Sequence, residues 1–291
     1  MLFGEEMKLY LHRMNLKKRT QIDIEEFLLH EKSVINRELW LRDVFSKQFE
    51  FAYRGSSIFF VPEPSETTTI DPKYIVGWLA RDRTMSERSA PWEGLEPKRH
   101  LFWKAALILI DPTHHEDGQK IAFQYQQEVG KPEPILDALA KYLSNPLEQS
   151  WGPYSVSIYP IIHEKSFFIF AEQHRGKIKE ITYEISVPNM FNSPDDFSNE
   201  MRDLRDRANV SKVRAKLMSD ETINTDASQL SEVAEHVEKG GGEIQAKTIS
   251  GEHYRSSEHA VSVEVQEPNP ESDEDTQGFW NRIGRALSRI F

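Results

Sequence analysis

The 291-residue sequence contains no cysteine. This absence excludes disulfide bonds, thiol catalysis and cysteine-ligated zinc or iron–sulfur centres, and it fits a protein from a reducing compartment. No apolar stretch is long enough to cross a bilayer, and the residues after Met1 lack the apolar run of a secretory signal. We therefore expect a cytoplasmic protein.

Short motifs of known catalytic sites are also missing. The sequence has no G-x-S-x-G, H-E-x-x-H or P-loop pattern. The loop Asp111–Asp117 concentrates possible metal ligands, including the adjacent His114 and His115. Adjacent histidines cannot both reach one ion without a distorted turn, and no second histidine pair has supporting spacing, so a polar hairpin tip is the better interpretation. We expect no catalytic residues, no metal and no cofactor.

The formal net charge of −11 argues against a protein that coats nucleic acid by bulk attraction. The charge is uneven, because Lys plus Arg balance Asp plus Glu over residues 1–100. The acidic surplus therefore lies entirely after residue 100. Any contact with nucleic acid must come from a local cluster of basic side chains.

Strand-like segments followed by a long charged helix are predicted within Gly152–Asp220. Apolar and polar residues alternate over Tyr154–Pro160, which is the period of a half-buried strand. Further along, Ser193 is a good N-cap and Pro194 suits the first position of a helix. Apolar residues then recur every three or four positions, so we predict one helix over residues 194–218.

The same predicted helix carries a stripe of basic residues beside its apolar stripe, and a smaller basic group flanks the preceding strand. The candidates for contact with nucleic acid are Arg175, Lys177, Lys179, Arg202, Arg205, Arg207, Lys212, Arg214 and Lys216. One interpretation is a row of phosphate contacts, which needs clustered Lys and Arg and no base-reading motif. The other is a solvated helix face with internal ion pairs, and the sequence leaves both open.

Neighbouring pairs of predicted strands with helices between them favour an α+β fold with mostly antiparallel sheets. We predict an N-terminal α+β domain over residues 1–100, which ends in an irregular exposed stretch at Arg81–Pro97. A central α+β domain follows over residues 101–266. Alternation in Ile244–Thr248 and in Val261–Val265 predicts that this domain closes with a hairpin.

The chain ends in two segments of different character. Residues 267–277 are rich in acidic residues, proline and serine, which predicts a disordered acidic linker. Residues 278–291 predict a basic amphipathic helix. Its candidate contact residues are Phe279, Trp280, Arg282, Ile283, Leu287 and Ile290. Such a helix lies in a membrane interface, docks into a groove of a partner or packs back on its own protein, and the sequence alone does not choose among these.

The layout of the middle third resembles the core of the Rex-type phage-exclusion proteins. The segments that carry the resemblance are Leu107–Asp111, Gly118–Phe123, the predicted helix 135–143, Tyr154–Ile162 and the stretch from His174 through HRGKIK to Pro188. The likeness is one of element order and of short apolar segments. The resemblance implies a cytosolic, dimeric DNA-binding protein that works with a membrane partner in defence against phage. The C-terminal tail departs from that family's pattern, so the mode of membrane or partner coupling does not carry over.

These observations predict a non-enzymatic protein that binds nucleic acid without reading its sequence and acts in phage defence with a partner protein. The resemblance favours double-stranded DNA and a homodimer, whereas the residues alone do not distinguish DNA from RNA. The alternative is an interaction or membrane-recruitment module at the membrane periphery that works through the C-terminal amphipathic helix. A hydrolase or nuclease ranks third, because nothing in the sequence positions a nucleophile or a metal.

Overall fold

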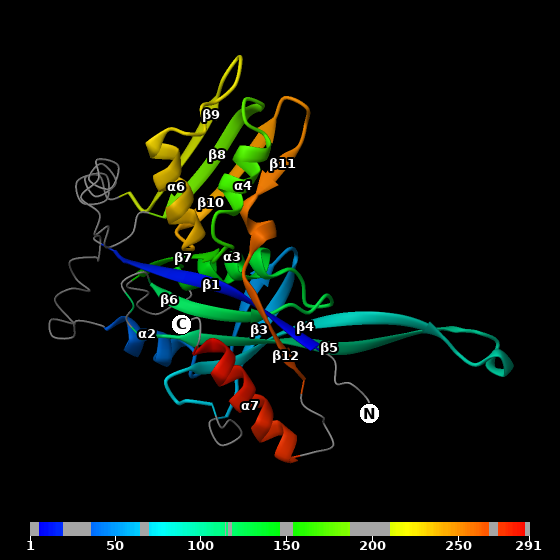
Figure 1. Cartoon of the computed structure of the whole chain (residues 1–291). Coiled ribbons are helices and arrows are strands. Elements are labelled where there is room, and N and C mark those ends of the chain that lie inside the picture. Colours follow the sequence, from blue (N-terminus) through cyan, green and yellow to red (C-terminus); the bar gives the residue numbers. More distant parts are fainter. Residues whose placement is uncertain are drawn as a thin grey trace.

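The computed structural model describes most of the chain as two antiparallel sheets with helices packed on them (Figure 1). The described residues are 6–19, 36–64, 70–113, 115, 118–145, 154–186, 210–267 and 273–288. Helices are interspersed among runs of strands along these ranges, and every described strand pair is antiparallel. The predicted α+β class with mostly antiparallel sheets is therefore confirmed.

The larger sheet is eight-stranded and follows the order β12-β1-β6-β5-β4-β3-β2, with β7 paired to β1. Its strands are β1 (Glu6–Lys18), β2 (Phe49–Tyr53), β3 (Ser56–Pro62), β4 (Ile75–Arg88), β5 (Pro97–Asp111), β6 (Gln119–Gln124), β7 (Tyr154–Pro160) and β12 (Ser262–Gln266). Strand β1 pairs with β6 along one side, and its other side pairs first with β12 and then with β7. The outer side of β7 is thereby left as a sheet edge.

Both faces of the large sheet are covered, which explains why its central strands are apolar on consecutive residues. Helices α2 (Arg37–Val44) and α3 (Pro132–Leu143) pack on one face, with Met14 and Leu16 of β1 in the same core. Helix α7 (Asp273–Leu287) packs on the opposite face, with Leu9 and Leu11 of β1. Because successive side chains of a strand point to opposite faces, β1 supplies both cores from one run of residues.

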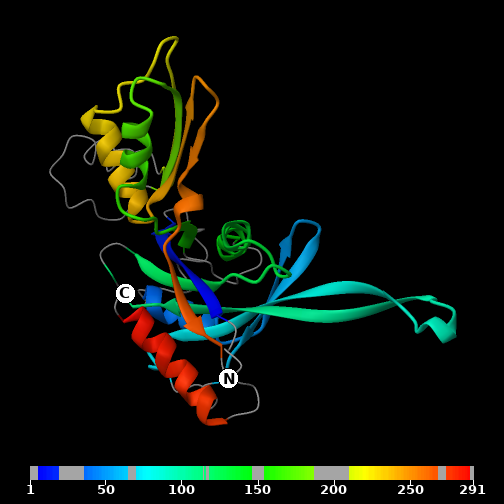
Figure 2. The ribbon, with the colours of Figure 1, turned by 45° about the vertical axis from the view of Figure 1, so that its right-hand side comes forward.

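The smaller sheet is four-stranded and is formed by the chain between β7 and β12. Its order is β11 (His253–Arg255), β10 (Gly242–Thr248), β8 (Ile178–Ser186) and β9 (Lys212–Met218). Helices α4 (Ser166–Gln173) and α6 (Ser228–Glu238) bury one face, where Ile181, Ile185 and Ile244 lie in a common core. The other face, called the open face below, is turned toward the side where α3 lies (Figure 2).

The predicted helix 194–218 is wrong at its C-terminal end. Lys212–Met218 is strand β9, paired with β8 in the register Ile185↔Val213 to Ile181↔Leu217. Residues 187–209 lie outside the described residues. Val213 and Leu217 are spaced by four, which suits a helix, but they also fit the alternation of a strand whose apolar side chains meet those of β8. Tertiary pairing decided between the two periods.

The stretch Arg81–Pro97 is not irregular, because β4 and β5 continue as a two-stranded arm that projects from the body (Figures 1 and 2). Its register runs from Arg81↔Lys104 to Arg88↔Pro97, and a 3-10 turn at Pro91–Glu93 lies at the tip. The predicted boundary at residue 100 therefore falls inside β5. The two sheets do not correspond to residues 1–100 and 101–266, since β12 returns to pair with β1.

The predicted closing hairpin and acidic linker also need correction. Ile244–Thr248 lies within β10 of the small sheet, whereas β12 belongs to the large sheet, so the two segments do not pair. Helix α7 begins at Asp273, inside the segment predicted as a linker. Residues 268–272 lie outside the described residues. The helix therefore extends further toward the N-terminus than predicted.

Candidate nucleic-acid interface

Basic side chains from three strands share the open face of the small sheet. Cross-strand neighbours in a sheet point to the same face, and the register therefore places these side chains in rows. One row runs Arg214, Glu184, Glu243, and the next runs Lys216, Thr182, Gln245, Arg255. The basic residues of the face are Lys212, Arg214, Lys216, Lys247 and Arg255.

Acidic residues between the rows offset part of this positive charge. Lys216 Nζ lies 3.0 Å from Glu180 Oε1, and Lys212 Nζ lies 3.4 Å from Glu184 Oε1. Both pairs are partly exposed, so each contributes little free energy and is readily exchanged for a phosphate contact. Within the described part of the chain, Arg214 and Arg255 form no ion pair.

Large aromatic side chains do not face outward from the described strands of this sheet. Tyr183 lies on the side of α4 and α6 with Ile181 and Ile185, and Tyr254 is buried in the same core. Recognition of unstacked bases relies on aromatic platforms of the kind that four-stranded RNA-binding sheets carry. The open face is therefore suited to contact a nucleic-acid backbone and poorly suited to stack on bases.

The structure brings together only part of the predicted basic cluster. Lys212, Arg214 and Lys216 lie side by side on the open face, as alternate residues of a strand. Arg202, Arg205 and Arg207 lie outside the described residues. Sequence reasoning missed Lys247 and Arg255, although the alternation of Ile244 and Ala246 implied that Lys247 points away from the core.

Arg175 and Lys177, which precede β8, lie in a turn outside the paired strands of this face. Arg175 lies in the turn after α4, and its guanidinium is 2.9 Å from Glu172 and 3.2 Å from Asp226. Lys177 is in the same turn. Lys179 is the extra residue of a β-bulge, because Lys247 pairs with Glu180 and Thr248 pairs with Ile178. Ile178 and Ile181 both lie in the core with α4 and α6, so Lys179 faces away from that core, as Glu180 does. These residues lie at the end of β8 that is remote from β7.

A cavity of about 590 Å³ lies where the open face meets α3 and the outer edge of β7. Two hydroxyl contacts join the sheets beside it. Tyr159 Oη donates to Glu184 Oε1 at 3.0 Å, and Ser157 and Ser186 share a 3.0 Å hydroxyl contact. The charged residues that line this acidic cavity are Glu133, Asp137 and Lys141 of α3, Glu184 and Lys212 of the small sheet, and Glu243 of β10.

Two carboxylates of the acidic cavity, Glu133 and Glu243, have raised pKa values. Burial raises the pKa of Glu133. Burial also raises the pKa of Glu243, and the neighbouring charges of Glu184, Glu133 and Asp137 raise it further. Glu243 and Glu133 are far apart in the sequence, so only the meeting of the two sheets produces this interaction.

His12 lines the same cavity and is 1% exposed. Burial lowers the pKa of His12 to about 4, so the ring is neutral at pH 7. Nδ1 lies 3.3 Å from the carbonyl oxygen of Tyr10, and a carbonyl only accepts, so Nδ1 carries the proton and donates. Nε2 is then an acceptor, and it has no hydrogen-bond partner in the described structure.

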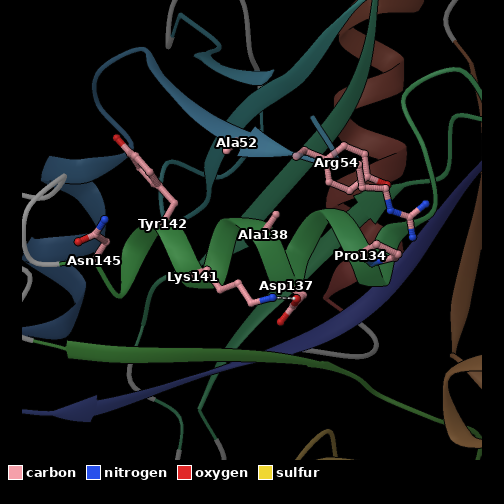
Figure 3. A pocket seen from close by; sticks show the side chains of 9 residues that line it. Ala52, Arg54, Pro134, Asp137, Ala138, Lys141, Tyr142 and Asn145 are labelled. Atoms are coloured by element: carbon pink, nitrogen blue, oxygen red, sulfur yellow. Dashed lines mark hydrogen bonds and ion pairs between the residues drawn. The ribbon is translucent and has the colours of Figure 1, made fainter. Parts of the chain in front are cut away.

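A second cavity, of about 510 Å³, lies between α3 and the β2–β3 hairpin (Figure 3). Asp137 and Lys141 line it as well, and their ion pair at 2.6 Å stands between the two cavities. Arg54 reaches toward it from the hairpin turn (Figure 3). Asp137 is the one carboxylate among its described lining residues, so the unbalanced negative charge belongs to the first cavity.

The apolar residues predicted for membrane or partner contact are buried against the body. Phe279 and Trp280 are each 4% exposed, and Ile283 and Leu287 are fully buried in the core beneath α7. Arg282 donates to the carbonyl oxygen of Gln266 at 3.4 Å. Ile290 lies outside the described residues. Of the three interpretations of the tail, the described part adopts the one in which the helix packs back on its own protein.

Neither a metal centre nor a membrane span is found in the described ranges. No group of three or more His, Asp or Glu side chains there converges to hold a metal ion. In the loop with adjacent histidines, His115 Nε2 lies 3.4 Å from Asp111 Oδ2 and also contacts Thr113, while His114 is outside the described residues. No helix described is both long and apolar enough to cross a bilayer.

Comparison with known proteins does not assign the chain to a family. No family model matches the chain, and no curated protein matches it.

Proposed function

We propose that this protein binds nucleic acid through its phosphate backbone, without reading base sequence and without catalysing a reaction. The observation that carries the proposal is the sharing of one sheet face, which no described helix buries, by basic residues from β9, β10 and β11. Phosphate contacts give affinity but carry no sequence information, so a sheet face whose cations contact phosphates binds any sequence. Double-stranded DNA is the proposed ligand.

The negative charge of the rest of the chain limits where the ligand lies. Glu184 and Glu243 share a row with Arg214 and repel phosphates at the end of the face next to the acidic cavity. The contact therefore extends from Arg214 toward Lys216 and Arg255, away from that cavity. With a net charge of −11, the remaining surface disfavours adsorption elsewhere on the molecule. Binding is therefore confined to this face and is sensitive to salt.

The arm is the surface proposed for a partner protein. Trp92 at its tip is 86% exposed, and Leu101 and Trp103 are 65% and 53% exposed on β5. Large exposed apolar side chains along a projecting element are suited to contact a partner protein. A role in phage defence with a partner protein, in a homodimeric assembly, follows from the resemblance to Rex-type proteins and belongs to the same proposal.

The test is fluorescence anisotropy with labelled duplexes of unrelated sequence. Arg214→Glu with Arg255→Glu should weaken binding by about tenfold or more and reduce the slope of log affinity against log salt by about 2. Lys98→Glu with Arg99→Glu makes the same change in net charge on the arm, away from the open face, and is the matched control. Absence of binding by the wild-type protein at low salt overturns the proposal, as does an equal loss in the control.

A further inference from the structure

The acidic cavity contains more negative charge than its own cations neutralise. Lys141 is paired with Asp137 at 2.6 Å, and Lys212 is paired with Glu184 at 3.4 Å. Glu133 and Glu243 remain, and neither forms an ion pair with any described residue. Two carboxylates held near each other without an ion-pair partner are costly to the fold, unless a ligand or protons compensate them.

A second, independent feature of the cavity also indicates a missing hydrogen-bond donor. His12 is almost completely buried, lines the cavity and has an unpartnered Nε2 that can only accept. A buried polar atom without a partner costs free energy, and such atoms in folded proteins are usually satisfied. Carboxylate oxygens and this nitrogen form a set of acceptors, so the complementary ligand must be rich in N–H donors.

The arrangement of these acceptors discriminates between kinds of cation. Magnesium and calcium require several oxygens that converge at about 2.0–2.6 Å. No three of the described acidic or histidine side chains converge in that way. The acceptors are instead spread over α3, β1 and β10 around about 590 Å³, a volume typical of a site for a small organic molecule. An extended cation fits this distribution, and a compact ion does not.

We propose that the acidic cavity binds an aliphatic polyamine, whose ammonium groups lie against Glu133 and Glu243 and donate to the buried acceptor of His12. The methylene segments between the ammonium groups lie along the apolar parts of the wall, such as Pro134 and Ile158. One consequence rests on the proposed nucleic-acid function. A bound polyamine neutralises Glu243 beside the basic rows of the open face, and so strengthens phosphate binding there.

The primary test is isothermal titration of the full-length protein with spermidine, without nucleic acid and at moderate salt. We expect saturable binding at one site. Glu133→Gln with Glu243→Gln keeps the side-chain shapes and should weaken that binding by about tenfold or more. Glu87→Gln with Glu93→Gln removes the same charge from the arm and is the matched control. The proposal is overturned if the wild-type protein shows no saturable binding, or if the control loses affinity as much as the cavity variant.

A second variant distinguishes loss of the binding site from a general effect of mutation on the fold. Ser155→Lys places a tethered ammonium at the half-buried wall of the cavity and should block spermidine, while its melting curve stays close to that of the wild type. Magnesium chloride at equal ionic strength should not displace spermidine. If magnesium displaced spermidine completely, the cavity would attract any cation through its negative charge or would bind the metal itself. Either result would overturn the polyamine assignment.

A third measurement separates this inference from the proposed function. Spermidine should raise DNA affinity of the wild-type protein more than that of the variant Glu133→Gln with Glu243→Gln. If spermidine binds at the cavity and no DNA binding is seen under any condition, the cavity assignment stands and the nucleic-acid proposal fails. If DNA binds and spermidine does not, the cavity assignment fails and the nucleic-acid proposal stands.

Discussion

Tyr159 Oη donates a 3.0 Å hydrogen bond to Glu184 Oε1, and this bond joins the edge strand of the large sheet to a central strand of the small sheet. Burial, followed by the charge and hydrogen bond of Glu184, raises the pKa of Tyr159 well above its ordinary range, so the phenol stays protonated as the donor. Asn15 Nδ2 also bridges the two parts of the chain by donating to the carbonyl oxygen of Gly240 at 3.4 Å. The cavity and the open face are positioned by this polar junction.

The first prediction concerns that junction. Tyr159→Phe keeps the ring but removes the donor, which should lower the free energy of unfolding by about 1–2 kcal/mol. Proteases should cut the segments between the sheets faster in this variant. Tyr125→Phe, at a half-exposed tyrosine of the large sheet, should leave both measurements unchanged. Equal behaviour of the two variants in thermal melts would show that the bond does not hold the sheets together.

The second prediction concerns the pH dependence of stability. Burial and neighbouring carboxylates raise the pKa of Glu243 above 4.5, so as pH rises the unfolded chain loses this proton first and the folded state is penalised. Glu243→Gln should therefore raise the melting temperature at pH 7.5. The advantage should disappear below about pH 4, where the carboxyl is protonated in both states. Glu264→Gln, exposed on β12, is the control, and a similar gain there would contradict the prediction.

The third prediction concerns the C-terminal helix. Ile283 is fully buried beneath α7, so Ile283→Ala should cost about 2–5 kcal/mol of unfolding free energy. Arg285→Ala, on the exposed side of the same helix, should change it by less than about 0.5 kcal/mol. Denaturant titration measures both. If Ile283→Ala were as stable as the wild type, the helix would be a detachable module, as its amphipathic sequence also allows.

The fourth prediction concerns the arm. None of the residues 84–101 belongs to a hydrophobic core cluster of the described structure. Arg83 and Phe102 face each other across the ladder. Replacing residues 84–101 between them by an Asn-Gly turn should leave the melting temperature of the body nearly unchanged. A fall of more than about 5 °C would show that the arm stabilises the fold as well as projecting from it.

The local sequence pattern was sufficient to predict several strands and helices. Alternation predicted Tyr154–Pro160 as a strand, and it is β7 with these bounds. The prolines near residue 132 and the apolar stripe of Ile135–Leu143 predicted a compact helix, which is the main part of α3. In Lys212–Met218 the predicted helical stripe ran through Ala215 and Met218, which are spaced by three and lie on opposite faces of the strand. Val213, Ala215 and Leu217 instead alternate with exposed residues, which is the period of β9.

The sequence by itself determined the α+β class, the absence of cysteine chemistry, the overall negative charge and the amphipathic character of the C-terminal helix. Only the tertiary structure decided that this helix covers the large sheet, that Lys247 and Arg255 join Arg214 on one face, and that Glu133 meets Glu243 in a cavity. The physical reason is that strand pairing is non-local. Side-chain periodicity tells which residues share a face of one element, but hydrogen-bonded register between distant segments decides which faces and charges come together.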